Sequence, residues 1–357
     1  MLRSTALFLL TFFCSVQAQL PDDARPSLLF SREDIPTLKD RIQRPPYDAW
    51  WATVLTRAQN GLPDGAPERT KARLAKTLAF VYLITDRETW AQQALSIMRD
   101  TRFPPRGGNM GQPHNEGELV AHYALAYDML HSYAETNDPS SLQEIRSILV
   151  EEAQRIKAGI VIAEIDLGVT KVAVRLDETP HWDNWHIRAY GGLGIAALAL
   201  RDHPDAHAWS ARAIELVARS LALQVDPQSG AYAEGPFYSR YSADVYLPYF
   251  IALRRVTGRD LFGETAVHAL HKWSLNLRMP NGRRPNVDDG HLDDFYGHYL
   301  ASIAENGGEF RWDWENNSSG LYVRQFSEPD AIALYDDSVE PTRPSRQPTV
   351  FMPSGGD

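Results

Sequence analysis

Apolar residues recur every three or four positions along most of the chain, the spacing that places them on one face of an α-helix. Leu74, Leu78 and Val81 follow this spacing within one such stretch. Helix-starting and helix-stopping residues divide the pattern into segments joined by short links. We therefore expect helices at residues 31–45, 47–60, 69–85, 87–99, 116–133, 141–158, 184–200, 206–225, 237–257 and 264–277.

The chain between residues 159 and 182 is less regular and contains β-branched runs, and no alternating β pattern of any length precedes about residue 320. Residues 321–324 and 331–335 are compatible with short strands or with helical pieces. Paired helices with short links favour stacked antiparallel hairpins, and the sequence has no fixed solenoid-type period. The predicted fold is therefore all-α, an incomplete (α/α) toroid of antiparallel helical hairpins.

Residues 1–18 have the pattern of a secretory signal peptide. Arg3 supplies the positive charge, residues 6–16 form the apolar run, and Val16-Gln17-Ala18 is a small-x-small cleavage pattern. The run is shorter than the roughly 20 residues that span a bilayer. We expect a periplasmic or secreted protein without membrane insertion, and a buried N-terminal helix is the alternative interpretation.

Composition and charge bear on which class of molecule the protein binds and on whether it has a disulfide. The 357 residues include 46 acidic and 36 basic side chains, giving a net charge of −10. A phosphate backbone is bound by clustered Lys and Arg, so this balance argues against nucleic acid. The single cysteine, Cys14, falls within the signal pattern, so the mature protein is expected to have no disulfide.

The last residues change in character. Residues 340–348 are rich in Pro and Arg, and an apolar run begins at Thr349 before the sequence stops at Asp357. A linker with nothing after it predicts a fragment whose next domain is missing, with a natural frayed tail as the alternative. We expect residues 19–335 to form the toroid, and residues 336–357 to form a linker and the start of a truncated domain.

Three segments combine turn residues with many His, Asn, Tyr, Trp and Glu side chains, and each stands where a loop enters a helix. They are residues 107–118, 181–188 and 231–241. In a ring of hairpins such entries can share one end of the ring and line one cleft, where helix N-termini also offer free N–H groups to anions. The sequence therefore places the candidate chemistry at these three entries.

A cleft of this kind suits β-elimination on a uronic-acid polymer. A lyase must neutralise the sugar carboxylate, remove the adjacent proton and protonate the leaving glycosidic oxygen. Asn or His suits the first task, and Tyr suits either of the others where a cation favours its phenolate. Arg240, two residues from Tyr238 and adjacent to Tyr241, can supply that cation or hold a substrate carboxylate.

Four motifs, in the same order, resemble the heparinase II/III-like and alginate-lyase-like polysaccharide lyases. They are Leu28-Leu-Phe-Ser-Arg-Glu-Asp-Ile-Pro-Thr-Leu38, Asn184-Trp with Gly191-Gly-Leu-Gly194, Glu234-Gly-Pro-Phe-Tyr-Ser-Arg-Tyr241, and Met279-Pro-Asn-Gly282 with Asn286-Val-Asp-Asp-Gly290. The resemblance covers essentially the whole mature chain. It implies an N-terminal (α/α) toroid followed by an antiparallel β-sandwich domain, and this sequence ends about where that sandwich would begin.

The resemblance also implies roles for individual residues. Asn184 would neutralise the carboxylate and Tyr238 would act as acid or base, with Tyr241 as the second choice. Arg240 and Gln112 would touch the sugar. Further candidates for substrate binding are His114, His186 and Glu234. The family's catalytic His and structural metal usually come from the sandwich domain, so no cofactor is expected in this chain and its activity alone is in doubt.

Ordinary structural roles compete with these assignments. Asn184 is also a good helix cap, Tyr238 and Tyr241 are also suited to packing, and Arg240 to a surface ion pair. Two other functions stay open as well. A glycoside hydrolase on the same architecture would need two carboxylates, for which the candidates are Asp183, Glu234 and Asp288 or Asp289. The third interpretation is a non-catalytic glycan-binding toroid. Alginate, heparan-type chains and other uronates are equally compatible with the sequence.

Overall fold

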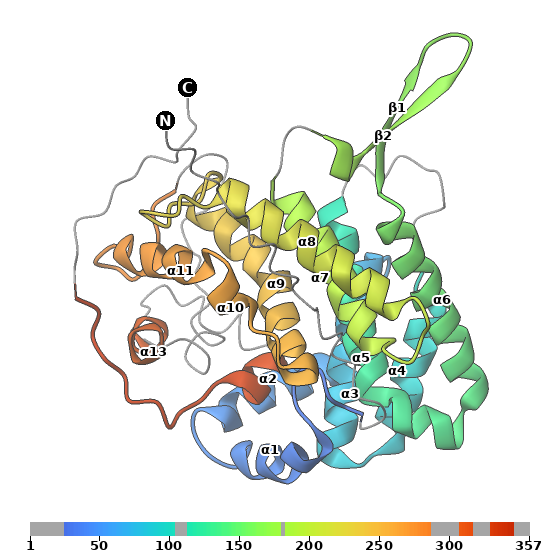
Figure 1. Ribbon diagram of the computed structural model, residues 1–357. Coiled ribbons are helices and arrows are strands. Elements are labelled where there is room, and N and C mark those ends of the chain that lie inside the picture. Colours follow the sequence, from blue (N-terminus) through green and yellow to red (C-terminus); the bar gives the residue numbers. More distant parts are fainter. Residues whose placement is uncertain (1–24, 104–112, 180–182, 287–306, 317–328, 346–357) are drawn as a thin grey trace, which may run out of the picture.

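The computed structural model describes residues 25–103, 113–179, 183–286, 307–316 and 329–345 (Figure 1). Helices account for 68% of these residues and strands for 5%, so the predicted all-α class is confirmed. The elements in chain order are η1 (Arg32–Asp34), α1 (Ile35–Arg41), α2 (Tyr47–Asn60), α3 (Glu68–Thr85), α4 (Glu88–Asp100), α5 (Pro113–Asn137), α6 (Pro139–Lys157), β1 (Val161–Asp166), β2 (Lys171–Arg175), η2 (Leu176–Glu178), α7 (Asn184–Ala199), α8 (Ala206–Gln224), α9 (Gly235–Thr257), α10 (Leu261–Glu264), α11 (Val267–Asn276), α13 (Gly307–Glu315) and α15 (Pro329–Leu334).

The helix boundaries follow the hydrophobic pattern closely, and the larger exceptions have local causes. Helix α5 is described from Pro113, which already lies before the expected start at residue 116. Helix α6 also starts at a proline, after Asp138, whose Oδ1 accepts the backbone N–H of Ser141 at 3.1 Å. As a result of the earlier start of α5, His114 belongs to this helix and not to the loop before it.

Helices α3 to α9 pack in two rows. Helices α3, α5, α7 and α9 each pack on the next, and α4, α6 and α8 form a second row against them. Their facing apolar side chains form one continuous buried core. Within the described residues, no helix combines the length and the hydrophobicity needed to cross a bilayer.

Glycines bring the backbones of α5 and α7 almost into contact and make room on α7 for a side chain of α9. A Cβ atom on Gly117 of α5 would overlap the carbonyl of Arg188 in α7, and one on Gly192 would overlap the carbonyl of Gly117. On the other side of α7, a Cβ atom on Gly194 would overlap the ring of Tyr249 in α9. These approaches fix the rotation of α7 between its neighbours.

The C-terminal segment folds back onto the first helices. Lys76 of α3 is fully buried, and its Nζ atom lies 2.9 Å from both carboxylate oxygens of Asp330 in α15. The ring of Tyr335 packs against those of Tyr47 and Trp50 in α2, with centroids 6.0 and 5.2 Å away. We call residues 329–345, with the side chains that hold them, the C-terminal clasp.

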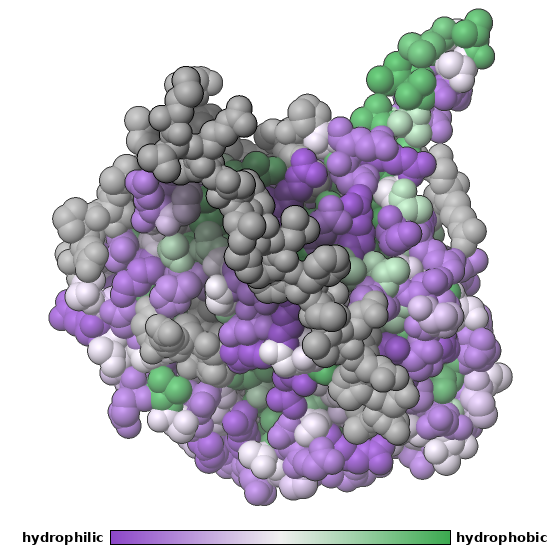
Figure 2. Space-filling view, viewed as in Figure 1, coloured by the Kyte–Doolittle hydropathy of each residue, from purple (hydrophilic) through white to green (hydrophobic). Residues whose placement is uncertain are grey.

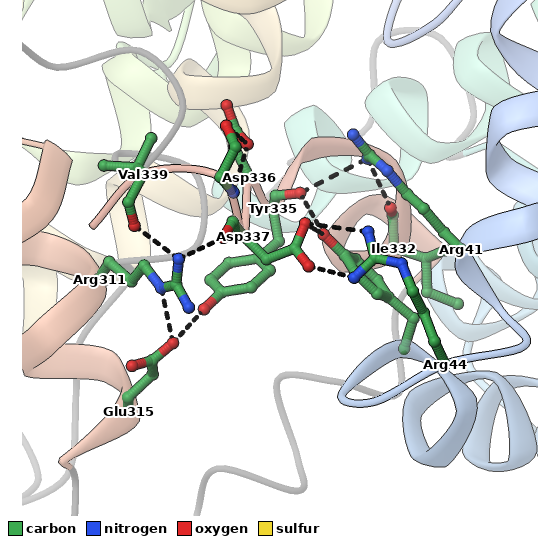
Figure 3. Close-up of polar contacts among 11 residues, drawn as sticks. Arg41, Arg44, Arg311, Glu315, Ile332, Tyr335, Asp336, Asp337 and Val339 are labelled. Carbon is green, nitrogen blue, oxygen red and sulfur yellow. Dashed lines mark hydrogen bonds and ion pairs between the residues drawn. The ribbon is translucent and has the colours of Figure 1, made fainter. Parts of the chain in front are cut away.

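Arginines complete the clasp at its surface (Figure 3). Arg44 pairs with Asp337, and Arg41 donates to the carbonyl of Ala333 at 3.1 Å. Arg311 of α13 donates to the carbonyl of Val339 at 2.5 Å. Residues 336–345, expected to begin a linker, thus lie against the helices.

A β-hairpin interrupts the helices within residues 159–182, the irregular stretch with β-branched runs in which no strand was predicted. Strands β1 and β2 pair antiparallel and project away from the helices (Figure 1). Each strand has only 6 or 5 residues, too few for the alternation to stand out. The hairpin forms the largely apolar projection in Figure 2, and Leu167 and Val169 between its strands are 59% and 97% exposed.

Candidate active site

The starts of α5, α7 and α9 meet around one arginine. Arg188 of α7 is buried, and its Nη2 atom lies 2.7 Å from Oε2 of Glu118 in α5. Its Nε donates to the carbonyl of His114 at 3.3 Å, and its Nη1 donates to the carbonyl of Tyr241 in α9. We call the side chains gathered here the entry cluster: His114, Glu118, Asn184, Trp185, Arg188, Glu234, Tyr238 and Tyr241.

Asn184 is the first residue of α7, and the helix cap before it is Asp183. Two donors of Asn184 point at one carboxylate: its backbone N lies 2.8 Å from Oε2 of Glu234, and its Nδ2 lies 2.7 Å from Oε1. The amide oxygen, Oδ1, is buried and has no hydrogen-bond partner among the described residues. Asn184 therefore joins the start of α7 to the start of α9 rather than capping its own helix.

Glu234 immediately precedes α9 and is mostly buried. Burial raises the pKa of its carboxyl to about 7, and the negative charge of Asp183 adds to this, while the hydrogen bonds from Asn184 and Tyr232 oppose it. The Tyr232 hydroxyl donates to Oε2 at 3.3 Å. A carboxyl group with this pKa exists in both protonation states near neutral pH.

Tyr238 and Tyr241 lie in the first two turns of α9, with their ring centroids 6.1 Å apart in an edge-to-face arrangement. The Tyr241 ring lies under the Arg188 guanidinium, whose Cζ is 3.7 Å from the ring centroid. Burial raises the pKa of the Tyr241 phenol, and the charge of Arg188 opposes that rise.

The cation beside Tyr241 is therefore Arg188 and not the expected Arg240. Arg240 instead contacts Asp244 on the same helix, with Nη1 2.9 Å from Oδ2. Neighbouring residues on a helix point in different directions, whereas residues four apart share a face.

His114 stands beside two of the aromatic residues of the cluster, Trp185 and Tyr241. Its ring centroid lies 5.3 Å from that of Trp185 and 5.9 Å from that of Tyr241. Its Nδ1 is buried without a hydrogen-bond partner among the described residues. Burial, helped by the charge of Arg188, lowers the pKa of His114 to about 4, so the imidazole is neutral at physiological pH.

His186 lies on a different side of α7 and is 1% exposed. Its Nδ1 is 3.1 Å from Oδ1 of Asp183, and its Nε2 is 2.7 Å from the carbonyl of Leu176 in η2. Nε2 thus holds the segment after the hairpin to α7 and Nδ1 contacts the cap of α7, which leaves neither nitrogen for the substrate contact expected of this residue. The other candidates Gln112, Asp288 and Asp289 lie outside the described residues.

Sequence reasoning missed Arg188 and Glu118, although both stand in the helix-entry segments that it selected, residues 181–188 and 107–118. Glu118 is buried, which by itself would raise its pKa, but a hydrogen bond with His122 and the charges of Arg188 and Arg73 hold the pKa well below its usual range. The available signal was a charged residue four positions after Asn184 in an otherwise apolar helix.

No group of three or more His, Cys, Asp or Glu side chains is arranged to hold a metal ion in the described ranges. The buried His271 is hydrogen-bonded within the core, with its Nε2 atom 2.9 Å from the hydroxyl oxygen of Tyr246.

No protein-family model matches this chain, and no curated protein matches it in sequence. The similarity to polysaccharide lyases therefore rests on the four motifs, two of which supply most of the entry cluster.

Proposed function

We propose that this chain is an exported polysaccharide lyase that cleaves a uronic-acid-containing polysaccharide by β-elimination. The observation that carries the proposal is the contact between Asn184 and Glu234. It places the amide implied by one motif beside the start of the helix that carries Tyr238, one turn further on. An amide donor and a phenol are the groups that neutralise a carboxylate and move a proton in such a reaction.

The proposal assigns separate tasks to the residues. The Asn184 amide binds the substrate carboxylate, so that negative charge developing on the sugar acid is stabilised. Tyr238 acts as the base that takes the proton from the carbon beside that carboxylate, or as the acid that gives a proton to the leaving glycosidic oxygen. Arg188 holds the three helix starts in register, and the neutral His114 ring offers a hydrogen-bonding group next to Tyr241.

We also propose that the helices close into an (α/α) toroid. Contacts beyond α9 support this arrangement. Tyr246 of α9 is hydrogen-bonded to His271 of α11, and the centroid of the His271 ring lies 6.2 Å from that of Phe310 in α13. Trp314 of α13 then lies 5.2 Å from Trp50 of α2, between ring centroids. Since α2 packs on α3, these contacts lead from the last helices back to the first.

Export follows from the signal-peptide pattern of residues 1–18, which lie outside the described residues. β-Elimination moves a proton and breaks a C–O bond without a change of redox state, so the proposed reaction requires no organic cofactor. The proposed partner is an acidic polysaccharide or oligosaccharide.

The test is an ultraviolet assay on a panel of uronate polymers, including alginate and heparan-type chains. A lyase creates a C4=C5 double bond that absorbs in the ultraviolet. We expect Tyr238→Phe to lower kcat/KM by about 10²–10⁴-fold, because it removes a proton-transfer group. The melting temperature should hardly change, since the ring is kept.

The matched control is Tyr82→Phe, which makes the same change in a half-buried tyrosine of α3 that packs against Tyr133. This variant should keep full activity. The proposal would be contradicted if no polymer of the panel gave unsaturated products, or if the two variants were equally active.

A glycoside hydrolase is the second candidate, favoured by the raised pKa of Glu234. A carboxyl group with a pKa near 7 is suited to be the general acid that protonates a glycosidic oxygen. The same reaction mixtures separate the two functions, because hydrolysis produces reducing ends without ultraviolet absorbance.

A further inference from the structure

The side-chain amide of Asn184 has an NH₂ group at one end and an oxygen at the other, and among the described residues only the NH₂ group is hydrogen-bonded. Nδ2 donates to Oε1 of Glu234 at 2.7 Å, while Oδ1 is buried without a partner among the described residues. An ionised carboxylate can only accept hydrogen bonds. As long as Glu234 is charged, it therefore selects the orientation in which the amide turns its NH₂ group toward Glu234.

This orientation is poorly suited to the task proposed for Asn184. A substrate carboxylate also accepts hydrogen bonds only, so it requires the NH₂ end of the amide. In the observed orientation one N–H of that group is committed to Glu234, and the other end of the amide is an acceptor oxygen. A rotation of the amide by about 180° about its last torsion exchanges the two ends.

Glu234 can drive that exchange because its surroundings allow it to take up a proton. The titratable groups facing it are Asp183 at the start of α7 and Tyr232 in the preceding loop. Asp183 is itself bound to His186, and Tyr232 lies 3.2 Å from Ser242 of α9 between hydroxyl oxygens. Among the described residues no Lys or Arg forms an ion pair with Glu234, so its charged form is favoured only by the hydrogen bonds from Asn184 and Tyr232.

We propose that Glu234 is a positioning residue whose protonation turns over the Asn184 amide and frees its NH₂ group for the substrate carboxylate. In the turned state the Glu234 O–H donates to Oδ1 of Asn184, and its other oxygen still accepts from the Asn184 backbone N–H. One proton is taken up from solvent for each uronate bound. This inference rests on the proposed function, since it needs Asn184 to bind a carboxylate.

The first experiment is the pH profile of Glu234→Gln. Glutamine mimics the protonated carboxyl, because its NH₂ group donates to Oδ1 and its oxygen accepts from the backbone N–H. We expect the wild-type kcat/KM to fall by about tenfold per pH unit above about pH 7. The variant should stay within about tenfold of the wild-type maximum and lose this fall.

Glu234→Ala separates this role from simple support of the fold. It removes both the acceptor and the donor, so it should lose more activity than Glu234→Gln at every pH, although both variants lose the same charge. Equal losses in the two variants, or an unchanged pH profile in Glu234→Gln, would overturn the inference while lyase activity of the wild type keeps the proposed function standing.

The second experiment measures the proton directly. Glucuronate is titrated into the wild type at pH 8 by calorimetry in two buffers that differ in ionisation enthalpy. We expect uptake of about one proton per ligand in the wild type and none in Glu234→Gln. Equal uptake in both proteins would overturn the inference. A wild type that neither binds glucuronate nor forms unsaturated products would overturn the proposed function, and this inference with it.

Discussion

The entry cluster and the C-terminal clasp are both built from buried polar side chains, but they use them differently. In the clasp, the buried Lys76 has an oppositely charged partner, Asp330, with both carboxylate oxygens within 2.9 Å. In the entry cluster, Glu234 is mostly buried and is held by neutral donors only, and Oδ1 of Asn184 and Nδ1 of His114 have no partner among the described residues.

The difference follows from what each region has to do. A buried ion pair with complete hydrogen bonding holds two segments far apart in sequence in one arrangement. A buried polar group with an unused donor or acceptor costs stability, so it is more often found where a ligand completes the hydrogen bonds. We therefore expect substitutions in the clasp to act on stability, and substitutions in the entry cluster to act on activity.

The largest effect is expected from Lys76→Met in the clasp. It leaves Asp330 buried without its cation, which should lower the free energy of unfolding by about 3–5 kcal/mol, measured by denaturant titration. Lys39→Met is the control, because Lys39 pairs with Asp86 at the surface and should contribute at most about 1 kcal/mol. Activity per folded molecule should be unchanged in both variants. A loss of activity in folded Lys76→Met would mean that the clasp also shapes the site.

Asn184→Ala should produce the opposite pattern. It removes the proposed carboxylate donor, so kcat/KM on a uronate polymer should fall by about 10²–10³-fold. The free energy of unfolding should change by only about 1 kcal/mol, because one side-chain hydrogen bond is lost. A large loss of stability with unchanged kcat in the folded fraction would show that the amide only joins α7 to α9.

The smallest effects concern the pH dependence of stability, where the two regions have opposite signs. The folded-state pKa of Glu234 is raised from 4.5 to about 7, so the folded protein binds more protons in this window and its stability falls as the pH rises through it. Asp337 of the clasp, hydrogen-bonded to Arg44, has its pKa lowered from 3.8 to about 2, so its contribution is lost as the pH falls through this range.

Melting temperatures between pH 2 and pH 8 test these signs. Glu234→Gln should flatten the curve between about pH 4.5 and 7 only, and Asp337→Asn should flatten it below about pH 4 only. The Asp337 effect should be small, because its ion pair is partly exposed and screened by solvent. The two regions would not be independent if Glu234→Gln changed the curve below about pH 4, or if Asp337→Asn changed it between about pH 4.5 and 7.

Much of the helical architecture could be predicted from the sequence, because an apolar stripe is a local property of the chain. The spacing of Leu74, Leu78 and Val81 predicts a buried face whatever lies opposite, and all three side chains are buried. The helix starts predicted at residues 184 and 237 likewise fall at, or two residues after, the observed starts at Asn184 and Gly235. The hairpin was missed, because its short strands expose their apolar side chains and leave no long alternating pattern.

The sequence by itself determined that this chain is a set of helices with chemically reactive side chains at three of their starts. Only the tertiary structure decided which of these side chains meet. Close packing at Gly117 and Gly194 sets the rotation of α7, and that rotation turns Arg188 toward Tyr241 and Asn184 toward Glu234. Helical periodicity acts over a few residues, whereas these contacts join residues some 50–70 positions apart and depend on how whole helices fit together.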